Sequence, residues 1–441
     1  MDGSVHRVLP GGDHVTPYQD YVYAYPHKTA YRPLDPRQRL RDVWANEPRD
    51  ALFHYVHIPF CEIRCGFCNL FTRTGAPAEL VTRYLDAVER QAMAVRDELG
   101  GRATFVQAAI GGGTPTYLEP DELARLFDII GLAGIPISVE TSPDTATPER
   151  LAVLAERGTT RVSVGVQSFD DTEARAAVRP QKRATVESAL DAIRAARIPV
   201  LNIDLIYGIT GQTDSSWRAS LDAALTWQPE ELYLYPLYVR PLTGLAGRET
   251  PQEWDEQRMR LYRLGRDHLL AAGYEQQSMR MFRRPDAPSS GGDDYSCQSD
   301  GMVGLGCGAR SYTRDLHYSF DYAVNPSAVR GIIDDYVSRP MSDFTRAEVG
   351  VRLDADEQRR RHLLQSVLQA EGLEKALYRK RFGTDVTDDF RELAELADRG
   401  WLTDSADRLR LTPEGLAWSD AIGPSLFSAA VRAAMAAYDR R

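Results

Sequence analysis

The sequence predicts an α/β protein whose main part is an open, partial (β/α)6 barrel. Six short apolar segments alternate with helical segments between residues 53 and 238, which implies a parallel sheet with right-handed crossovers. The length of 441 residues is enough for one large domain with one or two appendages. Six β/α units are too few to close an eightfold barrel, so we expect one side to stay open for a large substrate.

The barrel domain is expected over residues 51–250. Its strands are predicted at 53–58, 104–110, 136–140, 161–166, 200–206 and 231–238. Between the first two strands, apolar residues recur at helical spacing from Leu80 to Leu99. Further helices are predicted at 120–131, 148–157, 185–196 and 214–226, with start signals at Pro120-Asp-Glu and at Asp214.

Residues 1–50 form an irregular arm rich in tyrosine. We expect these aromatic side chains to pack on the barrel rather than to line a substrate site. The spacing of Tyr21, Tyr23 and Tyr25 also allows a short edge strand.

Residues 251–350 are expected to extend the barrel and to supply a segment on the substrate side. A helix is predicted at 252–272 and a strand at 274–282, before a turn-rich break that begins at Ser289. Residues 351–441 read as two helices and a small two-stranded wing, which predicts a winged-helix-like module. Such modules often bind DNA, but the acidic balance of this chain favours a packing or lid role.

The composition narrows the class of partner. A formal net charge of −10 argues against nucleic acid or an anionic membrane as the main partner, so we expect a small-molecule substrate. The sequence has no run of about 18 apolar residues and no charged-then-apolar leader, which predicts a cytoplasmic protein.

Three cysteines, Cys61, Cys65 and Cys68, follow the first predicted strand. Thiolates at this spacing can ligate three irons of a cubane iron–sulfur cluster, whereas a closed zinc site needs a fourth cysteine or histidine. A disulfide with one spare thiol is the alternative, but five cysteines in a long chain without a secretory signal fit a reducing compartment better. The fourth iron would keep an open position that an amino group and a carboxylate can chelate.

This cysteine pattern resembles the radical S-adenosylmethionine (SAM) superfamily, whose signature is Cys-x3-Cys-x2-Cys after the first strand of an α/β barrel. The resemblance implies a [4Fe–4S] cluster on the three cysteines. In that family, one electron from the cluster cleaves SAM to methionine and a 5′-deoxyadenosyl radical, which abstracts hydrogen from a substrate. A flavodoxin or ferredoxin-type reductant is the implied electron donor. Phe67 occupies the family's aromatic position near the adenine.

Polar motifs at strand ends test the barrel prediction, because active sites of β/α barrels gather there. Gly111-Gly112-Gly113-Thr114 closes the second strand and matches the family's glycine motif beside the methionine amino group. Glu140, Gln167 and Asp204 end the next three strands, where a hydrogen bond to a neighbouring loop is the alternative for each one alone. Together they favour a ligand such as a ribose diol.

The resemblance narrows to the oxygen-independent coproporphyrinogen III dehydrogenase group over about residues 50–420. The motifs that carry it are Tyr55-Val-His-Ile-Pro-Phe-Cys61, the glycine turn, Val-Gly-Val-Gln167-Ser-Phe, Asn-Ile-Asp204-Leu and Gly304-Leu-Gly306-Cys. That group also includes heme chaperones and radical SAM methyltransferases and cyclopropanases. The residues that the resemblance assigns to SAM are Tyr55, Gly112, Gly113, Thr114, Glu140, Gln167, Arg179 and Asp204. Arg179 would pair with the methionine carboxylate.

Three departures from the group guide the choice of reaction. Leu70 stands where the dehydrogenase carries another cysteine, and the heme chaperones' His-Asn-x-x-Tyr-Trp stretch is replaced by Gly292-Asp-Asp-Tyr-Ser-Cys297. The tyrosine-rich arm is typical of neither.

From these departures we expect methylation or cyclopropanation of a specialised metabolite, with a second SAM as the carbon donor. The alternatives are oxidative decarboxylation of coproporphyrinogen and a heme-binding chaperone, with a transcriptional regulator third. Cys297 and Cys307 could donate a hydrogen atom or bind a metal, but a free buried cysteine is commoner, and His27, His54 and His57 are expected to be core or strand histidines.

Overall fold

The computed structural model describes residues 16–247, 253–288 and 301–438, which fall into two compact units. We call them the barrel unit, Tyr31–Glu249 with Asp286–Arg352, and the terminal unit, which comprises Met1–Ala30, Thr250–Pro285 and Leu353–Tyr438. No helix among the described residues is long and apolar enough to cross a membrane.

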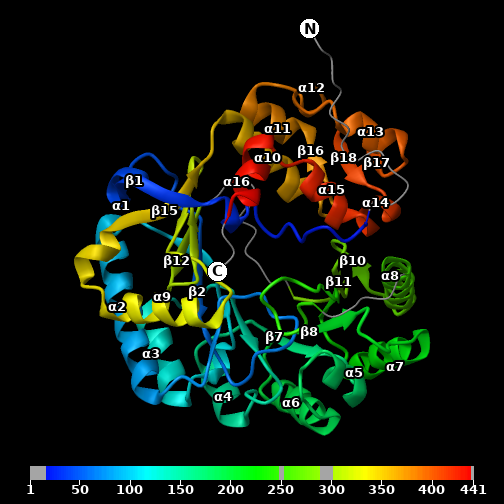
Figure 1. The fold of residues 1–441 in the computed structure, drawn as a ribbon, viewed down its shortest axis with the longest axis horizontal. Coiled ribbons are helices and arrows are strands. Elements are labelled where there is room, and N and C mark those ends of the chain that lie inside the picture. The colour runs from blue at the N-terminus through cyan, green and yellow to red at the C-terminus, as the bar shows by residue number, and fades with distance from the viewer. Residues whose placement is uncertain (1–15, 248–252, 289–300, 439–441) are drawn as a thin grey trace. The chain divides into compact units, whose positions relative to one another are not determined.

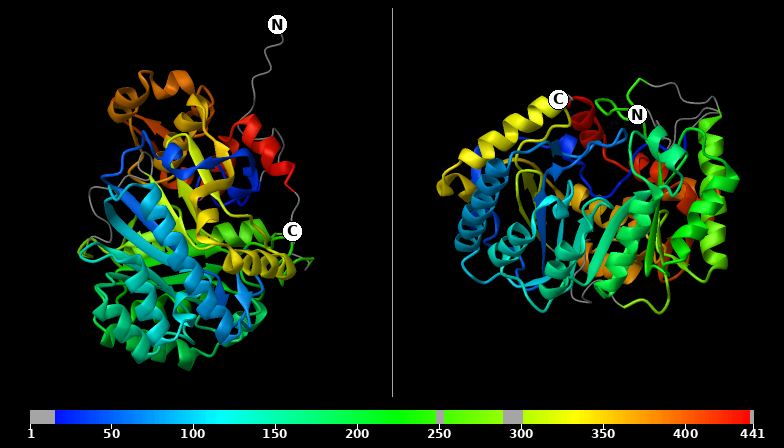
Figure 2. Two further views of the ribbon diagram at one scale, coloured as in Figure 1. Left: turned by 90° about the vertical axis from the view of Figure 1, so that its left-hand side faces the viewer. Right: turned by 90° about the horizontal axis from the view of Figure 1, so that it is seen from below.

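The barrel unit is built on six parallel strands, as predicted. They pair in chain order and are β2 (Leu52–Ile58), β5 (Phe105–Gly112), β6 (Ile137–Thr141), β7 (Arg161–Gln167), β8 (Val200–Tyr207) and β9 (Glu231–Pro236). The expected helices are present, with bounds within a few residues of those predicted: α2 (Ala78–Glu98), α3 (Pro120–Ile130), α4 (Pro148–Glu156), α6 (Arg183–Ala195) and α7 (Asp214–Leu225). These helices cover the outer side of the curved sheet (Figures 1 and 2).

Side chains alternate between two environments along these strands. On β9, Glu231, Leu232 and Leu234 are buried, whereas Tyr233 and Tyr235 are half-buried and point to the inner face of the sheet. The outward side chains pack under the helices, so the apolar core lies between the sheet and its helical layer. Polar side chains are left to the inner face.

The sheet continues beyond β2 in a way that the sequence analysis missed. β12 (Met302–Leu305) pairs in parallel with β2, and antiparallel strands follow it: β13 (Arg310–Tyr312), β14 (Leu316–Ser319), β15 (Arg346–Arg352) and β1 (Arg32–Arg39). The arm was expected to be irregular, so β1 is a correction. As an edge strand it tolerates Pro33 and Pro36, which remove ladder donors.

Three elements link this extension to the barrel helices. α1 (Leu40–Val43) follows β1, and α9 (Pro326–Ser338) packs beside α2 (Figure 1). A short 3₁₀ turn, Met341–Thr345, also packs on α2 and leads into β15. The predicted barrel extension at 251–350 is therefore divided, because only its second half belongs to the barrel unit.

The terminal unit contains α8 (Trp254–Ala271) and the C-terminal module. Residues 274–282 were predicted as one strand, but they form the hairpin of β10 (Glu275–Gln276) and β11 (Met281–Arg283). Gln277 N donates to Met281 O at 2.8 Å, and this turn reverses the chain after two strand residues.

The C-terminal module agrees with the winged-helix-like prediction. α10 (Ala355–Val367) and α11 (Lys375–Phe382) pack with a three-stranded sheet of β16 (Leu373–Glu374), β18 (Arg408–Leu411) and β17 (Leu402–Asp404), in that order. Its remaining helices are α12 (Val386–Asp389), α13 (Leu393–Asp398), α14 (Pro413–Ala417), α15 (Ser419–Ser425) and α16 (Ala429–Ala436). The two strands of the predicted wing are β17 and β18, which pair antiparallel.

Tyr21 and Tyr25 of the arm pack inside the terminal unit. Tyr25 is fully buried and its ring lies 5.1 Å from that of Phe427, while the Arg280 guanidinium lies 3.9 Å over the Tyr21 ring. No strand forms at residues 21–25 within this described segment. Buried aromatic packing, as expected, is therefore present, but the partners of Tyr21 and Tyr25 belong to the terminal unit rather than to the barrel.

Candidate active site

The predicted site residues lie along the carboxyl edge and the inner face of the six-stranded sheet. Cys61 ends the short strand β3 (Phe60–Cys61), which pairs with β4 (Arg73–Thr74), and the other two cysteines lie in the loop between them. Asp204 was expected to end its strand, but β8 continues for three residues beyond it to Tyr207. Its side chain still faces inward, toward the groups contributed by β6 and β7.

The cysteine loop is held against the loop that follows β7 and α5 (Asp171–Ala176). Gly66 N donates to the carbonyls of Ala177 and Val178 at 3.1 and 3.2 Å, and Leu245 N donates to Gly66 O at 2.8 Å. A Cβ on Gly66 would lie 2.7 Å from Val178 Cβ, a distance that side chains do not adopt. Glycine at position 66 therefore allows Cys65 and Cys68 to approach this part of the barrel rim.

Each cysteine sulfur has a polar neighbour. Arg179 Nη1 donates to Cys65 Sγ at 3.0 Å, and Thr114 Oγ1 donates to Cys61 Sγ at 3.5 Å. Cys68 Sγ lies 3.9 Å from Thr72 Oγ1. Such contacts are favourable to a sulfur that carries negative charge.

Burial opposes ionisation of these thiols when no cation is near. It raises the pKa of Cys61 to about 12 and also raises the pKa of Cys68. Bound iron would supply the positive charge that such a thiolate needs.

The three thiols of the loop are a donor set for an iron–sulfur cluster. A cubane cluster binds each thiolate through a different iron, so three cysteines of one loop can ligate three of its irons. Cys61, Cys65 and Cys68 are thus suited to hold a [4Fe–4S] cluster.

His57 links Tyr55 to the cysteine loop, a role that the sequence analysis missed. His57 Nε2 donates to Phe71 O at 3.0 Å, because a carbonyl can only accept, and Nδ1 then accepts from Tyr55 Oη at 3.3 Å. A Cβ on Gly112 or on Gly308 would lie 2.4 or 2.3 Å from the His57 ring. The i, i+2 spacing of Tyr55 and His57 on one strand was the signal that could have revealed their contact.

Glu140 holds the glycine turn. Gly112 N donates to Glu140 Oε2 at 2.9 Å, and a Cβ on Gly111 would lie 2.8 Å from the same carboxylate. The carboxyl group is accessible from the inner face but crowded by protein atoms, and this desolvation raises its pKa. The Gly112 amide lowers that pKa and the charge of Asp204 raises it.

Asp204 accepts hydrogen bonds from two inward-facing neighbours. Asn202 Nδ2 donates to Oδ1 at 2.7 Å and Ser163 Oγ donates to Oδ2 at 3.3 Å. Burial raises the pKa of Asp204 to about 6 in spite of these donors. On the two strands that flank β8, Arg161 Nε pairs with Oε2 of the fully buried Glu231 at 2.7 Å. The sequence analysis missed these four neighbours, although their alternation on β7, β8 and β9 places them on the inner face.

Arg179 is anchored on two sides. Its Nε donates to Gln181 Oε1 at 2.7 Å and its Nη2 donates to Gly165 O at 2.6 Å. Gln167 has a positive φ of 69°, which turns the chain at the end of β7. Phe67, which lies in the cysteine loop, is half-buried.

Cys307 lies apart from the cysteine loop, beyond the end of β12. It is 1% exposed, its amide donates to Tyr84 Oη at 3.3 Å, and Tyr84 Oη donates to His57 O at 2.8 Å. Burial raises the pKa of this thiol to about 12, as expected of a structural cysteine. Cys297 lies outside the described residues.

Comparisons with known proteins agree with this architecture. Residues 55–224 match the Radical SAM superfamily, and residues 353–418 match the HemN C-terminal domain. The chain is 28% identical to the heme chaperone HemW of Bacillus subtilis over 82% of its own length and 95% of that protein. It is 27% identical to the oxygen-independent coproporphyrinogen III oxidase of Pseudomonas aeruginosa over 96% of its own length and 92% of that enzyme.

A solved structure supports the fold. The coproporphyrinogen III oxidase HemN from Escherichia coli, described as a radical SAM enzyme, superimposes with a TM-score of 0.75 at 23% identity. The match covers 92% of this chain and 96% of that one.

The predicted cofactors are thereby supported, since the radical SAM family uses a [4Fe–4S] cluster and SAM. The chain thus contains a radical SAM domain followed by a HemN C-terminal domain, the combination that fits the HemN-like radical SAM group.

Proposed function

We propose that this radical SAM enzyme oxidatively decarboxylates a coproporphyrinogen-type tetrapyrrole. The observation that carries the proposal is the end-to-end correspondence with curated relatives, which includes both the radical SAM domain and the HemN C-terminal domain. The coproporphyrinogen III oxidases among these relatives favour oxidation over the methylation expected from the sequence.

The chain's own residues supply a binding surface for SAM on the inner face. Gly112 and Gly113 let the turn pack against His57 and Phe60, and Glu140 and Asp204 present carboxylate oxygens to hydroxyl or amino donors. The bound cluster supplies one electron for the cleavage of SAM. The residues proposed to hold SAM remain Tyr55, Phe67, Gly112, Gly113, Thr114, Glu140, Gln167, Arg179 and Asp204.

Aromatic side chains on the inner face favour a planar substrate. Tyr233 and Tyr235 stack on β9 with ring centroids 5.8 Å apart, and both are half-buried. Beyond the strand, the Arg240 guanidinium lies 4.3 Å over the Tyr238 ring. Stacked tyrosines suit a pyrrole ring, and an arginine at the rim suits a propionate side chain.

We propose a small molecule as the substrate and a flavodoxin or ferredoxin-type protein as the electron donor. The formal net charge of −10 supports the absence of a nucleic-acid or membrane partner.

The test is an anaerobic assay of the reconstituted protein with reductant, SAM and coproporphyrinogen III. We expect 5′-deoxyadenosine together with loss of propionate carboxyl groups from the substrate, both detected by mass spectrometry. Cys65→Ala should abolish both products, while Cys307→Ala, which removes a buried thiol outside the loop, should retain them. Formation of 5′-deoxyadenosine with unchanged coproporphyrinogen would contradict the proposed substrate.

A methyl transfer or cyclopropanation with a second SAM is the second candidate. The observation that favours it is Leu70, which stands where the dehydrogenase group carries a cysteine, with 46% of its side chain exposed beside the cysteine loop. S-adenosylhomocysteine or methylthioadenosine in the same assay would support this candidate. A heme-binding role would instead give an intact cluster without 5′-deoxyadenosine and a Soret shift on stoichiometric heme addition.

A further inference from the structure

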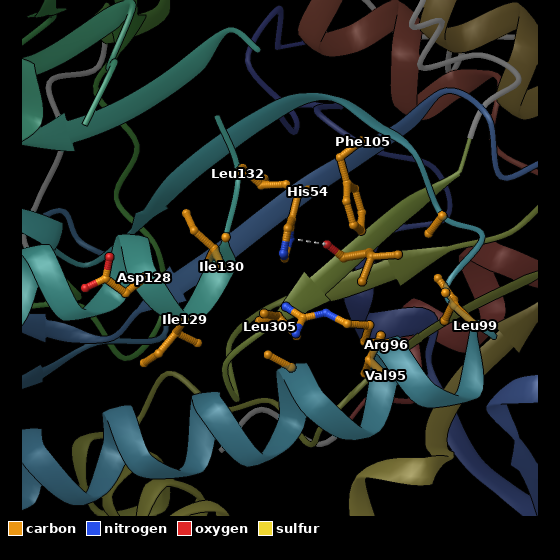
Figure 3. A pocket seen from close by; sticks show the side chains of 15 residues that line it. His54, Val95, Arg96, Leu99, Phe105, Asp128, Ile129, Ile130, Leu132 and Leu305 are labelled. Carbon is orange, nitrogen blue, oxygen red and sulfur yellow. Dashed lines mark hydrogen bonds between the residues drawn. The ribbon is translucent and has the colours of Figure 1, made fainter. Parts of the chain in front are cut away.

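A cavity of about 470 Å³ lies on the outer side of the barrel unit, away from the cysteine loop. Its walls come from β2, β5 and β12 of the sheet and from α2 and α3 of the helical layer. Figure 3 shows the side chains that surround it. A cavity of this size is in the range of small-ligand sites, and we call it the outer cavity.

The walls of the outer cavity are mostly apolar. The apolar side chains that line it are Ala92, Val95, Leu99, Ala103, Phe105, Ile129, Ile130, Leu132, Val303 and Leu305. These apolar side chains offer few hydrogen-bond partners to water, so this part of the wall suits the apolar body of a ligand. The body of a bound molecule would therefore be hydrocarbon or aromatic.

One cation faces this apolar space. Arg96, in the last turn of α2, extends toward His54 in Figure 3, and its charge contributes to lowering the His54 pKa. Within the described residues, no carboxylate or carbonyl pairs with the Arg96 guanidinium. The nearby Asp128 carboxylate pairs with Arg157 at 2.5 Å instead. A ligand anion could bind Arg96 without displacing an existing partner.

His54 is a second polar group of the wall and is held neutral. Its Nδ1 donates to Val303 O at 3.2 Å, and its ring stacks on Phe105 with centroids 4.6 Å apart. Burial lowers the pKa of His54 to about 4, so the ring carries no positive charge near neutral pH. The positive charge at this wall therefore comes from Arg96 alone among the described lining residues.

We propose that the outer cavity binds an amphipathic carboxylic acid, whose apolar body packs between α2 and α3 and whose carboxylate pairs with Arg96. The site is separate from the proposed SAM surface, because His54 and Tyr55 alternate to opposite faces of β2. A bound acid would nevertheless rest on the strand that leads into the cysteine loop. It would stabilise the barrel unit by binding only the folded state.

The experiment uses the full-length, cluster-reconstituted protein and three probes that differ only in the head group: octanoate, octan-1-ol and octylammonium. Isothermal titration calorimetry should show octanoate binding most tightly. Because Arg96 is exposed at the edge of the cavity, Arg96→Gln should weaken octanoate by about three- to fivefold, the loss expected for one exposed ion pair, and should leave octan-1-ol unchanged. The matched control is Arg102→Gln, a nearby exposed arginine outside the cavity, which should change neither.

Two further variants test the location. Ala103→Trp should fill the cavity and abolish binding of all three probes, and Arg96→Glu should reverse the preference in favour of octylammonium. The reversal is a gain of binding, so it does not depend on the tolerance of the core for tryptophan. The proposal is overturned if octanoate does not bind the wild-type protein, or if Arg96→Gln and Arg102→Gln bind it equally well.

Discussion

The guanidinium of Arg179 donates a hydrogen bond from Nη1 to the sulfur of Cys65 at 3.0 Å. Two further bonds, to Gly165 O and Gln181 Oε1, fix the plane of the guanidinium. The arginine is therefore poised against a predicted cluster ligand, although the sequence suggested a partner in the methionine carboxylate. Hydrogen bonds to ligand sulfurs stabilise the more negative, reduced form of an iron–sulfur cluster.

Arg179→Gln is expected to lower the reduction potential of the reconstituted cluster by about 60 mV. That shift corresponds to about 1.4 kcal/mol for one electron, the energy of a charge-assisted hydrogen bond. A redox titration followed by electron paramagnetic resonance measures it. Arg175→Gln, at an exposed site on α5, is the control. An unchanged potential in Arg179→Gln, with full iron content, would show that this contact does not tune the cluster.

Gly112→Ala is expected to destabilise the barrel unit by about 2 kcal/mol or more and to impair SAM cleavage. The backbone φ of 114° is unfavourable for alanine, and the new Cβ would lie 2.4 Å from the His57 ring. Urea unfolding and the yield of 5′-deoxyadenosine measure the two effects.

Gly134→Ala separates the two causes, because Gly134 has a positive φ of 74° but open space around its Cβ position. This variant should lose only the backbone term, about 1–2 kcal/mol. An equal loss of unfolding free energy in the two variants would mean that the clash with His57 does not contribute to the destabilisation.

The stability of the protein should depend on pH through Asp204. Its pKa is about 6 in the folded protein and its ordinary value is 3.8, so the folded state binds the proton more tightly than the unfolded state. The contribution of Asp204 is therefore fully present below about pH 4 and is lost as pH rises through about 6. Asp204→Asn should be more stable than wild type at pH 8, by about 1–3 kcal/mol, and lose that advantage at pH 4.

Urea unfolding at pH 4, 6 and 8 measures this dependence, with Asp222→Asn on the outer helix α7 as the control. A stability difference between Asp204→Asn and wild type that is the same at all three pH values would argue that Asp204 does not titrate in this range.

In the terminal unit, Tyr25→Phe is expected to cost about 1–3 kcal/mol of stability. Tyr25 Oη donates to Glu357 Oε2 and accepts from Ser428 N at 3.2 Å, so its removal leaves a buried carboxylate oxygen and an amide without this partner. Burial together with the Glu357 charge raises the Tyr25 pKa, so the hydroxyl stays protonated and remains a donor.

Thermal unfolding compares this variant with Tyr23→Phe, whose ring is 39% exposed and should tolerate loss of the hydroxyl. A double-mutant cycle with Glu357→Gln then isolates the pair. Additive effects of Tyr25→Phe and Glu357→Gln would exclude a significant interaction between the two side chains.

Sequence reasoning located the barrel strands because each is a continuous apolar run of strand length between helical patterns. It failed for β12 to β15, because short turns interrupt them. It also failed for β1, because the prolines of this segment are not expected in a central strand. Those strands are stabilised by partners such as the pairing of Arg32 with Gly350, more than 300 residues apart in the chain. Local periodicity carries no information about such a pairing.

The same division holds for the active site. By itself, the sequence determined the spacing of Cys61, Cys65 and Cys68 and the order of polar residues along the strands, since covalent connection and alternation fix both. Only the tertiary structure decided that Arg179 contacts Cys65 and that His57 fits between Gly112 and Gly308. These contacts depend on how distant backbone segments pack, and packing distances of a few tenths of an ångström are set by the whole fold rather than by any one segment.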